Sequence, residues 1–213
     1  MTMRDEQTVR SVYDSVAPAY SALLPDLRAE QPVDRALISA FGEEVAGTGN
    51  RRVLDAGCGT GRMLAVLQQM GLHPVGVDLS PGMVEQARRR QPEAELRVAD
   101  LGSLPYGEGA FGGVLAWYCL IHHEALELQD ALAELARVTA PGGILLTAFH
   151  LGSGAVETPH AYGTDRTVTK HLRGLDELAS LLGGSGWETT ASLRREAVTE
   201  KHPQGFMTAR RSG

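Results

Sequence analysis

A glycine-rich segment and an aspartate that follows it have the residue types needed to bind a ribose-containing ligand. The segment VLDAGCGTGR, residues 53–62, contains Gly57, Gly59 and Gly61. Glycine lets a backbone bend sharply and approach a ligand closely. Asp78 lies about 20 residues beyond the loop in VGVDLS, where a carboxylate can accept hydrogen bonds from both ribose hydroxyls. The spacing predicts a nucleoside site.

The loop departs from the patterns that bind phosphates. In the GxGxxG fingerprint of dinucleotide-binding proteins, counted from Gly57, the third small residue would fall at position 62, which is arginine. The phosphate loop GxxxxGK[ST] is also absent from the sequence. We therefore expect a ligand without phosphates, and this disfavours an NAD-dependent oxidoreductase.

Asp100 completes a predicted adenosine pocket. It lies in RVADLGSLP, where it can accept a hydrogen bond from the exocyclic amine of adenine, and Leu79 and Leu101 offer apolar walls for the ring. A single aspartate could instead cap a turn or a helix. Asp55, Asp78 and Asp100 nevertheless fall at the ends of three successive predicted strands, which makes coincidence a poor explanation.

Two neighbouring histidines are candidates for proton transfer. His122 and His123 lie in YCLIHH, after a predicted strand, and imidazole is well suited to act as a general base near neutral pH. His122 is the first candidate and His123 the second. Turn histidines that only bond backbone or cap the next helix are an equally good alternative. No HExxH or other metal-ligand spacing occurs, so no metal is expected.

Alternating strand and helix patterns position these residues. Such alternation predicts a mostly parallel sheet with helices on both faces. The first 48 residues are predicted to be helical, with a break around Pro25, and two last strands could form an antiparallel edge hairpin. The predicted strands are 53–56, 74–77, 95–99, 112–119, 144–149, 188–194 and 205–209, with a turn at 141–143, and the later helices are 62–70, 81–90, 124–138 and 175–182.

Bulk composition narrows the kinds of protein the chain can be. Its 213 residues are 43% hydrophobic and 22% charged, which is typical of one globular domain. No apolar run approaches the roughly 20 residues of a membrane span, and the charged N-terminus lacks the features of a secretory signal, so we expect a cytoplasmic protein. Cys58 and Cys119 lack metal or redox spacing. A net charge of −6 disfavours nucleic acid as a partner.

These motifs resemble those of the class I S-adenosylmethionine-dependent methyltransferases, over about residues 10–150. DAGCGTG is similar to the first motif of that family, GVDLS to its ribose motif and VADLGSLP to its adenine motif. ELARVTAPGGILL resembles the signature that runs through the fifth strand. YDSVAPAY, residues 13–20, is similar to the N-terminal cap helix of the small-molecule branch, which is related to methyltransferase types 11 and 25.

The resemblance implies a Rossmann-like fold in a single domain, residues 1–213. The sheet would be doubly wound, seven-stranded and mostly parallel with an antiparallel last strand. Residues 1–48 would form a helical cap and residues 49–213 the core. Arg88, Arg89 and Arg90 end a predicted helix, where they suit the helix dipole and solvent.

The resemblance also implies the cofactor and its contacts. Asp55 and the glycine loop would hold the methionine part of S-adenosyl-L-methionine, Asp78 the ribose and Asp100 the adenine. Tyr20, and also Tyr13, would contact the cofactor carboxylate or close the site. Trp117 would lie beside the methionine chain. The remaining cofactor contacts implied are Ala56, Leu79, Met83, Ala99 and Leu101.

The reaction implied is methyl transfer to an oxygen, nitrogen or carbon atom of a small molecule, with S-adenosyl-L-homocysteine as the other product. Alternatives are a methyltransferase of RNA or protein and a non-catalytic S-adenosylmethionine-binding protein. WYCL replaces the NPPY-type tetrapeptide after the fourth strand, which disfavours methylation of an amine on a base or on glutamine. Residues 151–173 are expected to form much of the acceptor wall. His150 and His160 are weaker candidate bases, and a monomer or homodimer without a membrane partner is expected.

Overall fold

The computed structural model describes residues 3–213, in which helices and strands alternate along most of the chain. The helices are α1 Met3–Leu23, α2 Pro32–Gly47, α3 Arg62–Gln69, α4 Pro81–Arg90, α5 Ala125–Val138 and α6 Leu175–Gly184, with short 3₁₀ turns η1 Leu27–Ala29, η2 Leu120–His122 and η3 Ala161–Gly163. The strands are β1 Arg52–Ala56, β2 His73–Asp78, β3 Glu95–Val98, β4 Phe111–Trp117, β5 Thr139–His150, β6 Ala155–Thr158, β7 Val168–His171, β8 Trp187–Arg195 and β9 Gln204–Arg211.

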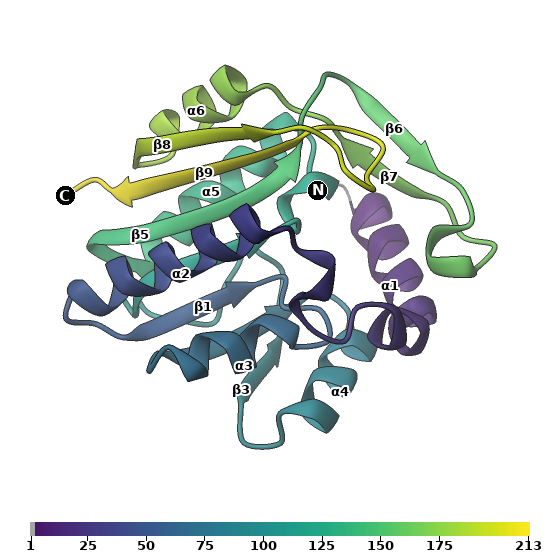
Figure 1. Ribbon diagram of the computed structural model, residues 1–213, viewed down its shortest axis with the longest axis horizontal. Helices are drawn as coiled ribbons and strands as arrows, with labels where there is room; N and C mark the ends of the chain where they lie inside the picture. Colours follow the sequence, from purple (N-terminus) through teal and green to yellow (C-terminus); the bar gives the residue numbers. More distant parts are fainter. Residues whose placement is uncertain (1–2) are drawn as a thin grey trace.

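The main sheet has seven strands in the order β3-β2-β1-β4-β5-β9-β8. Strands β1 to β5 pair in parallel, whereas β9 is antiparallel to both β5 and β8. The predicted terminal hairpin therefore forms, with its second strand inserted between β5 and the edge (Figure 1). This sheet confirms the fold class expected from the sequence.

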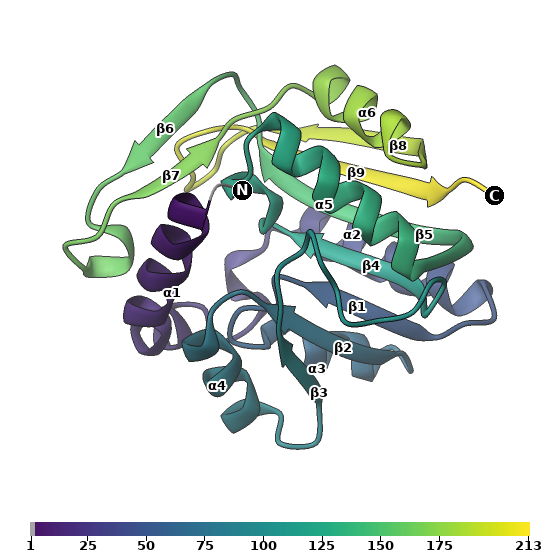
Figure 2. The same cartoon turned by 180° about the vertical axis from the view of Figure 1, so that it is seen from behind.

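Helices cover both faces of the sheet because successive strand residues point to opposite sides. Val53 packs with residues of α2 and α3 in one apolar cluster, whereas its neighbour Leu54 packs with residues of α5 and α6 in another. Leu64 of α3 packs against Val84 of α4. The two layers are seen from opposite sides in Figure 1 and Figure 2. The carboxyl ends of the central parallel strands remain available for a site.

Two predicted boundaries differ from the structure for local reasons. The turn expected at 141–143, before a strand at 144, instead lies inside β5. The β4–β5 register shifts from Phe111↔Thr139 to Gly113↔Ile144, so the intervening residues bulge, with Gly142 at a φ of 75°. Strand β4 ends at Trp117 rather than at 119, because Tyr118 has a φ of 59°. That backbone turns the chain away from the sheet.

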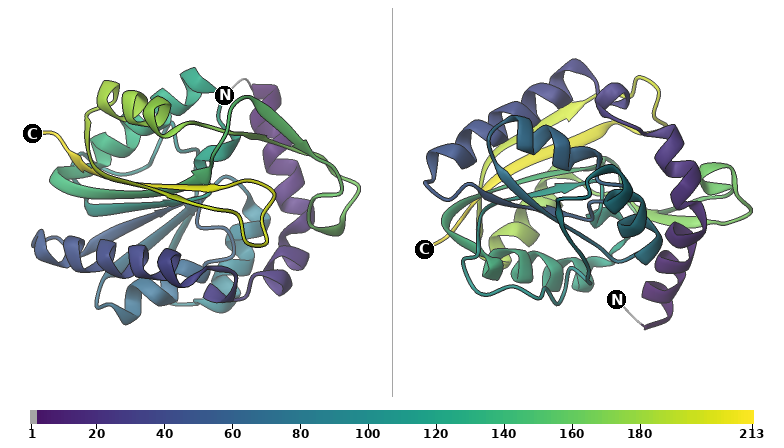
Figure 3. Two further views of the ribbon diagram at one scale, coloured as in Figure 1. Left: turned by 45° about the horizontal axis from the view of Figure 1, so that its top comes forward. Right: turned by 90° about the horizontal axis from the view of Figure 1, so that it is seen from below.

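The small β6–β7 hairpin and the N-terminal helix α1 lie side by side. Strands β6 and β7 pair in antiparallel fashion within a segment for which no regular element was predicted. Val168 of β7 and Ala161 of η3 pack with Val12 and Val16 of α1. Figure 3 shows α1 running beside this hairpin. The expected acceptor wall is thus a structured element that braces the cap helix.

Three expectations from the sequence, about membrane spans, the two cysteines and the arginine triplet, can be compared with the described residues. Over residues 3–213, no helix combines the length and apolarity needed to span a bilayer. Cys58 and Cys119 are both free thiols. Arg90 differs from the solvent role expected for the arginine triplet, because its guanidinium donates to the carbonyl oxygens of Ser21 and Pro25 and so ties α4 to the end of α1.

Candidate active site

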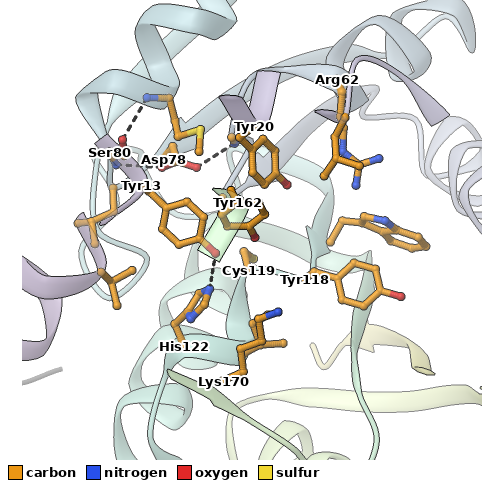
Figure 4. A pocket seen from close by; sticks show the side chains of 18 of the residues that line it. Tyr13, Tyr20, Arg62, Asp78, Ser80, Tyr118, Cys119, His122, Tyr162 and Lys170 are labelled. Carbon is orange, nitrogen blue, oxygen red and sulfur yellow. Dashed lines mark hydrogen bonds between the residues drawn. The ribbon is translucent and has the colours of Figure 1, made fainter. Parts of the chain in front are cut away.

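A cavity of about 330 Å³ lies at the carboxyl ends of β1, β2 and β4. Such a position is where open parallel sheets bind ligands. Its walls come from the loops after these strands, from α1 and from β7 (Figure 4). The predicted site residues that line it are Tyr13, Tyr20, Gly57, Gly59, Asp78, Leu79, Met83, Asp100, Leu101, Trp117, His122 and His123. Asp55, Ala56, Gly61 and Ala99 are not among its lining residues. Ala56, Gly61 and Ala99 each directly precede a lining residue, and Asp55 lies two residues before Gly57.

The glycine loop is shaped by backbone geometry that a side chain would prevent. Gly57 has a φ of 64°, and a Cβ atom built there would lie only 2.2 Å from Cβ of Cys119. Glycine alone adopts such a backbone without strain. The loop after β1 therefore packs directly against the chain that leaves β4, which closes the floor of the cavity.

Asp78 ends β2 with both carboxylate oxygens held by backbone amides. Gly59 N donates to Oδ2 at 2.8 Å, and Ser80 N donates to Oδ1 at 2.9 Å. Burial raises the pKa of Asp78 to about 6, although these two hydrogen bonds act in the opposite direction. The carboxylate is thus fixed between the glycine loop and the start of α4, at the cavity wall.

Asp14 of the cap helix joins the same network and was not singled out from the sequence. Its Oδ1 accepts hydrogen bonds from Ser80 Oγ at 2.6 Å and from Gly82 N at 2.8 Å. Ser80 Oγ also accepts from Met83 N at 3.0 Å and so caps α4. A carboxylate at a helix N-terminus is favourable for the helix dipole. These contacts fasten α1 over the site, and Asp14 lies within the quoted segment YDSVAPAY.

Asp55 is a buried carboxyl group with an unsatisfied oxygen. Only 2% of the residue is exposed, and Oδ2 has no hydrogen-bond partner among the described residues. Burial raises its pKa to about 8, while the positive charge of Arg62 acts to lower it. A buried acceptor without a donor is costly, so this oxygen is suited to a cationic or hydrogen-bonding ligand group. Asp100 lines the cavity and accepts from Gly102 N at 2.6 Å.

Three tyrosines form an aromatic cluster at the cavity, here called the tyrosine cluster: Tyr13 and Tyr20 of α1 and Tyr162 of η3. The ring centroids of Tyr20 and Tyr162 are 4.9 Å apart, and those of Tyr13 and Tyr162 are 6.0 Å apart. Burial raises the pKa of all three phenols above its usual value, so they remain neutral. Tyr162 lies in the segment without recognisable chemistry, and no sequence signal identified it.

A buried ion pair forms a second wall near the glycine loop. Arg62 Nη1 donates to Glu30 Oε1 at 2.5 Å, and Trp117 Nε1 donates to the same oxygen at 3.2 Å. Glu30 Oε2 is buried without a partner among the described residues. Arg62, which excluded the dinucleotide pattern, therefore has a structural partner and faces the cavity (Figure 4). Glu30 was not identified from the sequence.

His122 has both ring nitrogens engaged. Nδ1 lies 2.9 Å from the carbonyl oxygen of Thr169, and Nε2 lies 2.7 Å from the Tyr13 hydroxyl. Since a carbonyl can only accept, Nδ1 carries the proton and Nε2 accepts from Tyr13. Burial lowers the pKa of His122 to about 4. Burial also lowers the pKa of His123, whose Nδ1 has no partner among the described residues.

The part of the cavity away from Asp78 is lined by polar residues, of which only His150 was identified from the sequence. Tyr118, Lys170 and Gln204 line it together with His150. His150 Nδ1 lies 3.0 Å from Gln204 Oε1. His160, the other weaker candidate base, has a largely exposed side chain and is not a lining residue. In residues 3–213, no group of three or more metal-ligating side chains is arranged to hold a metal ion.

The fold and the cavity define a Rossmann-like α/β protein with a site for a nucleoside-type ligand. A family described as a methyltransferase domain matches residues 53–143. The chain is 32% identical over 200 residues to malonyl-[acyl-carrier protein] O-methyltransferase of Serratia marcescens, covering 92% of this chain and 71% of that protein. It is 33% identical over 175 residues to demethylmenaquinone methyltransferase of Renibacterium salmoninarum, covering 81% and 69%.

A solved structure extends the match over nearly the whole chain. The 1,6-didemethyltoxoflavin-N1-methyltransferase of Burkholderia thailandensis, solved with bound 1,6-didemethyltoxoflavin and S-adenosylhomocysteine, is 25% identical with a TM-score of 0.72, covering 97% of this chain and 88% of that one. The chain belongs to the class I S-adenosylmethionine-dependent methyltransferases. The expected family, enzyme class and cofactor are thereby confirmed, while the role of each site residue stays a prediction.

Proposed function

We propose that this protein transfers the methyl group of S-adenosylmethionine to a small-molecule acceptor bound in the same cavity. The observation that carries the proposal is the placement of Asp78, with both oxygens fixed by backbone amides, between the glycine loop and α4 at the wall of the cavity. The acceptors in the names of the relatives, among them demethylmenaquinone and 1,6-didemethyltoxoflavin, support a small-molecule acceptor.

The cofactor would be held by residues of the first half of the core. Asp78 is assigned to the ribose hydroxyls and Asp100 to the adenine amine, with Leu79 and Leu101 against the ring. The unsatisfied oxygen of Asp55 suits the ammonium group of the methionine part. Further contacts are proposed for Ala56, Gly57, Gly59, Gly61, Met83, Ala99 and Trp117.

The cationic and anionic groups near the glycine loop suit the zwitterionic end of the cofactor. Arg62 and the Tyr20 hydroxyl are available for its carboxylate, and Glu30 has one buried oxygen without a partner. Placing a zwitterion here would satisfy groups that otherwise lose hydration on burial. This arrangement supports a proposal that the methionine end lies under α1.

Methyl transfer requires mainly that the protein position two reactants. When bound, the cofactor supplies a methyl group activated by its sulfonium. The protein's residues must align the acceptor with that carbon and exclude water, and such alignment can contribute several kcal/mol (about 7–11 at the upper end). The tyrosine cluster and the Asp14 contacts to α4 close the cavity. His122 or His123 remains a candidate to remove a proton from the acceptor.

Calorimetric titration with S-adenosylmethionine, S-adenosylhomocysteine and NAD tests the cofactor assignment. We expect binding of the first two compounds and none of NAD. Asp78→Asn, which keeps the shape but removes the charge, should weaken binding by about 10- to 100-fold, the value of a hydrogen bond to a charged group. Asp130→Asn, an exposed residue of α5, is the matched control. NAD binding, or equal affinity for wild type and Asp78→Asn, would contradict the proposal.

We further propose that the chain acts as a single domain in the cytoplasm, as a monomer or homodimer. The continuous sheet and the clusters that join the cap helices to the core support one domain. Analytical ultracentrifugation and limited proteolysis would test this, since a two-domain chain should yield two stable fragments.

A further inference from the structure

His150 has one ring nitrogen, Nε2, that no group of the described residues 3–213 binds. The residue ends β5, directly opposite Gln204 of β9 in the antiparallel register. Its Nδ1 lies 3.0 Å from Gln204 Oε1, whereas no hydrogen bond involves Nε2 among the described residues. The residue lines the cavity. It is therefore a histidine with one nitrogen tied to the fold and one available to a ligand.

The buried amide of Gln204 fixes which nitrogen of His150 carries the proton. Gln204 is completely buried, and its Nε2 donates to the carbonyl oxygen of His202 at 2.6 Å. Only the NH₂ group can donate to a carbonyl, so the amide oxygen must face His150. An amide oxygen can only accept, so Nδ1 of His150 is the protonated nitrogen. The lone pair is thereby left on Nε2.

The neighbouring Tyr118 is held in an unusual backbone conformation that places its ring against His150. Its φ is 59°, a conformation that costs a non-glycine residue about 1–3 kcal/mol and that clusters at functional sites. The ring centroids of Tyr118 and His150 are 5.3 Å apart, with 33° between the planes. This contact restricts rotation of the imidazole, so the direction of Nε2 is fixed by two neighbours.

Lys170 of β7 adds a positive charge that no carboxylate of the described residues neutralises. Two carboxylates of the cavity lining, Glu200 and Asp34, both form ion pairs with Arg195. Burial lowers the pKa of Lys170. In Figure 4 its side chain points into the cavity, on the side away from Asp78. A half-buried cation without a carboxylate partner favours a ligand group that is or becomes negative.

His122, the first candidate from the sequence, differs from His150 because the lone pair on its Nε2 is already engaged. Its Nε2 already accepts a hydrogen bond from Tyr13 at 2.7 Å, and its Nδ1 is bonded to Thr169. To act as a base it must first lose the Tyr13 contact, which belongs to the cap helix. His150 needs no such rearrangement.

We propose that His150, oriented by Gln204 and Tyr118, is the general base of the acceptor site, and that Lys170 stabilises the negative charge that forms on an acidic hydroxyl acceptor, a phenol or an enol. This assignment rests on the proposed methyl transfer. The acceptor O–H bond breaks and its proton goes to His150 Nε2. The acceptor oxygen bonds to the methyl carbon as the carbon–sulfur bond breaks, with that electron pair remaining on sulfur. The imidazolium then returns its proton to water.

The basicity of His150 limits the acceptor class. Burial first, and then the nearby charge of Lys170, lower its pKa to about 4. The other titratable groups around the ring are Tyr118 after β4 and Glu200 and His202 before β9. Lys170, which lines the cavity with His150, can stabilise the anion of an acidic hydroxyl, so proton transfer to His150 is easier from a phenol or an enol than from an alcohol.

A first experiment reads the state of His150 without any acceptor. Nitrogen-15 NMR of histidine-labelled protein, with S-adenosylhomocysteine added and His150→Gln for assignment, should show a protonated Nδ1 and an unprotonated Nε2 from pH 5 to 8. Lys170→Met should raise the titration midpoint of His150, because the removed positive charge disfavoured the imidazolium. Gln204→Leu should shift the tautomer. A proton on Nε2, or a midpoint unaffected by Lys170→Met, would overturn the proposal.

A second experiment measures methyl transfer to catechol and 4-nitrophenol, with benzyl alcohol as the non-acidic comparison. We expect methyl ethers of both phenols and none of the alcohol. His150→Gln should lower kcat by about 100-fold with little change in KM, a typical contribution of a general base. Lys170→Met should move the acidic limb of the pH profile upward. His160→Gln, an exposed residue, is the matched control.

The outcomes separate this assignment from the proposed function. Loss of the acidic limb in His122→Gln but not in His150→Gln would overturn the assignment of His150. No methylation of either phenol, with S-adenosylhomocysteine still bound, would overturn the acceptor class. Absence of S-adenosylhomocysteine binding in folded wild-type protein would overturn the proposed function, and this assignment with it.

Discussion

The two halves of the cavity are built in different ways. The part proposed to bind the cofactor, here called the cofactor half, comes from segments close together in sequence, the loop after β1 and the ends of β2 and β3, and its polar contacts are largely backbone amides that fix carboxylates. The part proposed to bind the acceptor, here called the acceptor half, brings together Tyr118, His150, Lys170 and Gln204 from four strands or strand ends, and its contacts are between side chains.

This difference indicates in which half of the cavity residues can be substituted without disrupting the other half. A substitution cannot replace a backbone amide donor, and glycines in this loop have conformations that other residues rarely adopt. The cofactor half is therefore constrained by the fold itself. Side chains at strand ends and in a hairpin can change while the sheet remains. We therefore expect substitutions in the cofactor half to weaken cofactor binding and those in the acceptor half to change turnover or acceptor choice.

The largest expected effect is at Gly57. Gly57→Ala places a Cβ atom 2.2 Å from that of Cys119 at a φ of 64°, so the loop must move, and we expect S-adenosylhomocysteine binding to fall below detection. Gly154→Ala is the matched control, with a φ of 79° but no atom within 4 Å of the added Cβ. Cys119→Gly added to Gly57→Ala should restore part of the affinity. Calorimetry of the folded variants checks this, and normal binding by Gly57→Ala would contradict it.

The next effect is a proton linkage at Asp55. Its pKa of about 8 means that it is mostly protonated at pH 7, and an ammonium group beside it would lower that pKa. Cofactor binding should then release about one proton, and affinity should rise about tenfold per pH unit from pH 6 to 8 and level off above. Titration in buffers of different ionisation enthalpy measures the proton. Asp55→Asn should lose the linkage, and unchanged proton release in that variant would exclude the role of Asp55.

A smaller effect is expected where the cap helix is fastened to the core. Asp14→Ala removes the acceptor for Ser80 Oγ and Gly82 N. We expect affinity for S-adenosylhomocysteine to fall about 5- to 30-fold, the value of one or two lost hydrogen bonds of about 1–2 kcal/mol in total. Proteolysis within α1 should also become faster. Glu85→Ala, an exposed position of α4, serves for comparison, and equal behaviour of both variants would argue against a closed cap.

The smallest effect concerns the fold outside the cavity. Arg90→Met removes the donors to the carbonyl oxygens of Ser21 and Pro25, at a cost of about 1 kcal/mol. Thermal unfolding should then shift downward by about 2–4 °C, as expected for a chain of this size. Arg89→Met, whose partner is the exposed Glu85, should leave the midpoint unchanged. A larger shift for Arg89→Met would reverse this interpretation.

The sequence predicts the sheet and the cofactor half because both depend on local patterns. Glycines after an apolar run and aspartates at strand ends can be recognised from a few neighbouring residues. The Arg90 contacts, the bulge around Gly142 and the β6–β7 hairpin depend on partners far along the chain, so no local pattern indicates them.

The acceptor half could not be found in this way. Gln204 is an ordinary polar residue until the β5–β9 register places it opposite His150. The sequence favours His122 as the base because it comes just after the predicted strand 112–119, whereas its hydrogen bond with Tyr13 depends on how α1 crosses the site. Tertiary packing decides which lone pair is available.

A crystal structure with S-adenosylhomocysteine bound tests the central claim most directly, because it locates both halves at once. We expect the ribose at Asp78, the adenine between Leu79 and Leu101 near Asp100, and the sulfur facing the space beside His150 and Lys170. An adenosine bound elsewhere, or a sulfur turned away from His150, would contradict it.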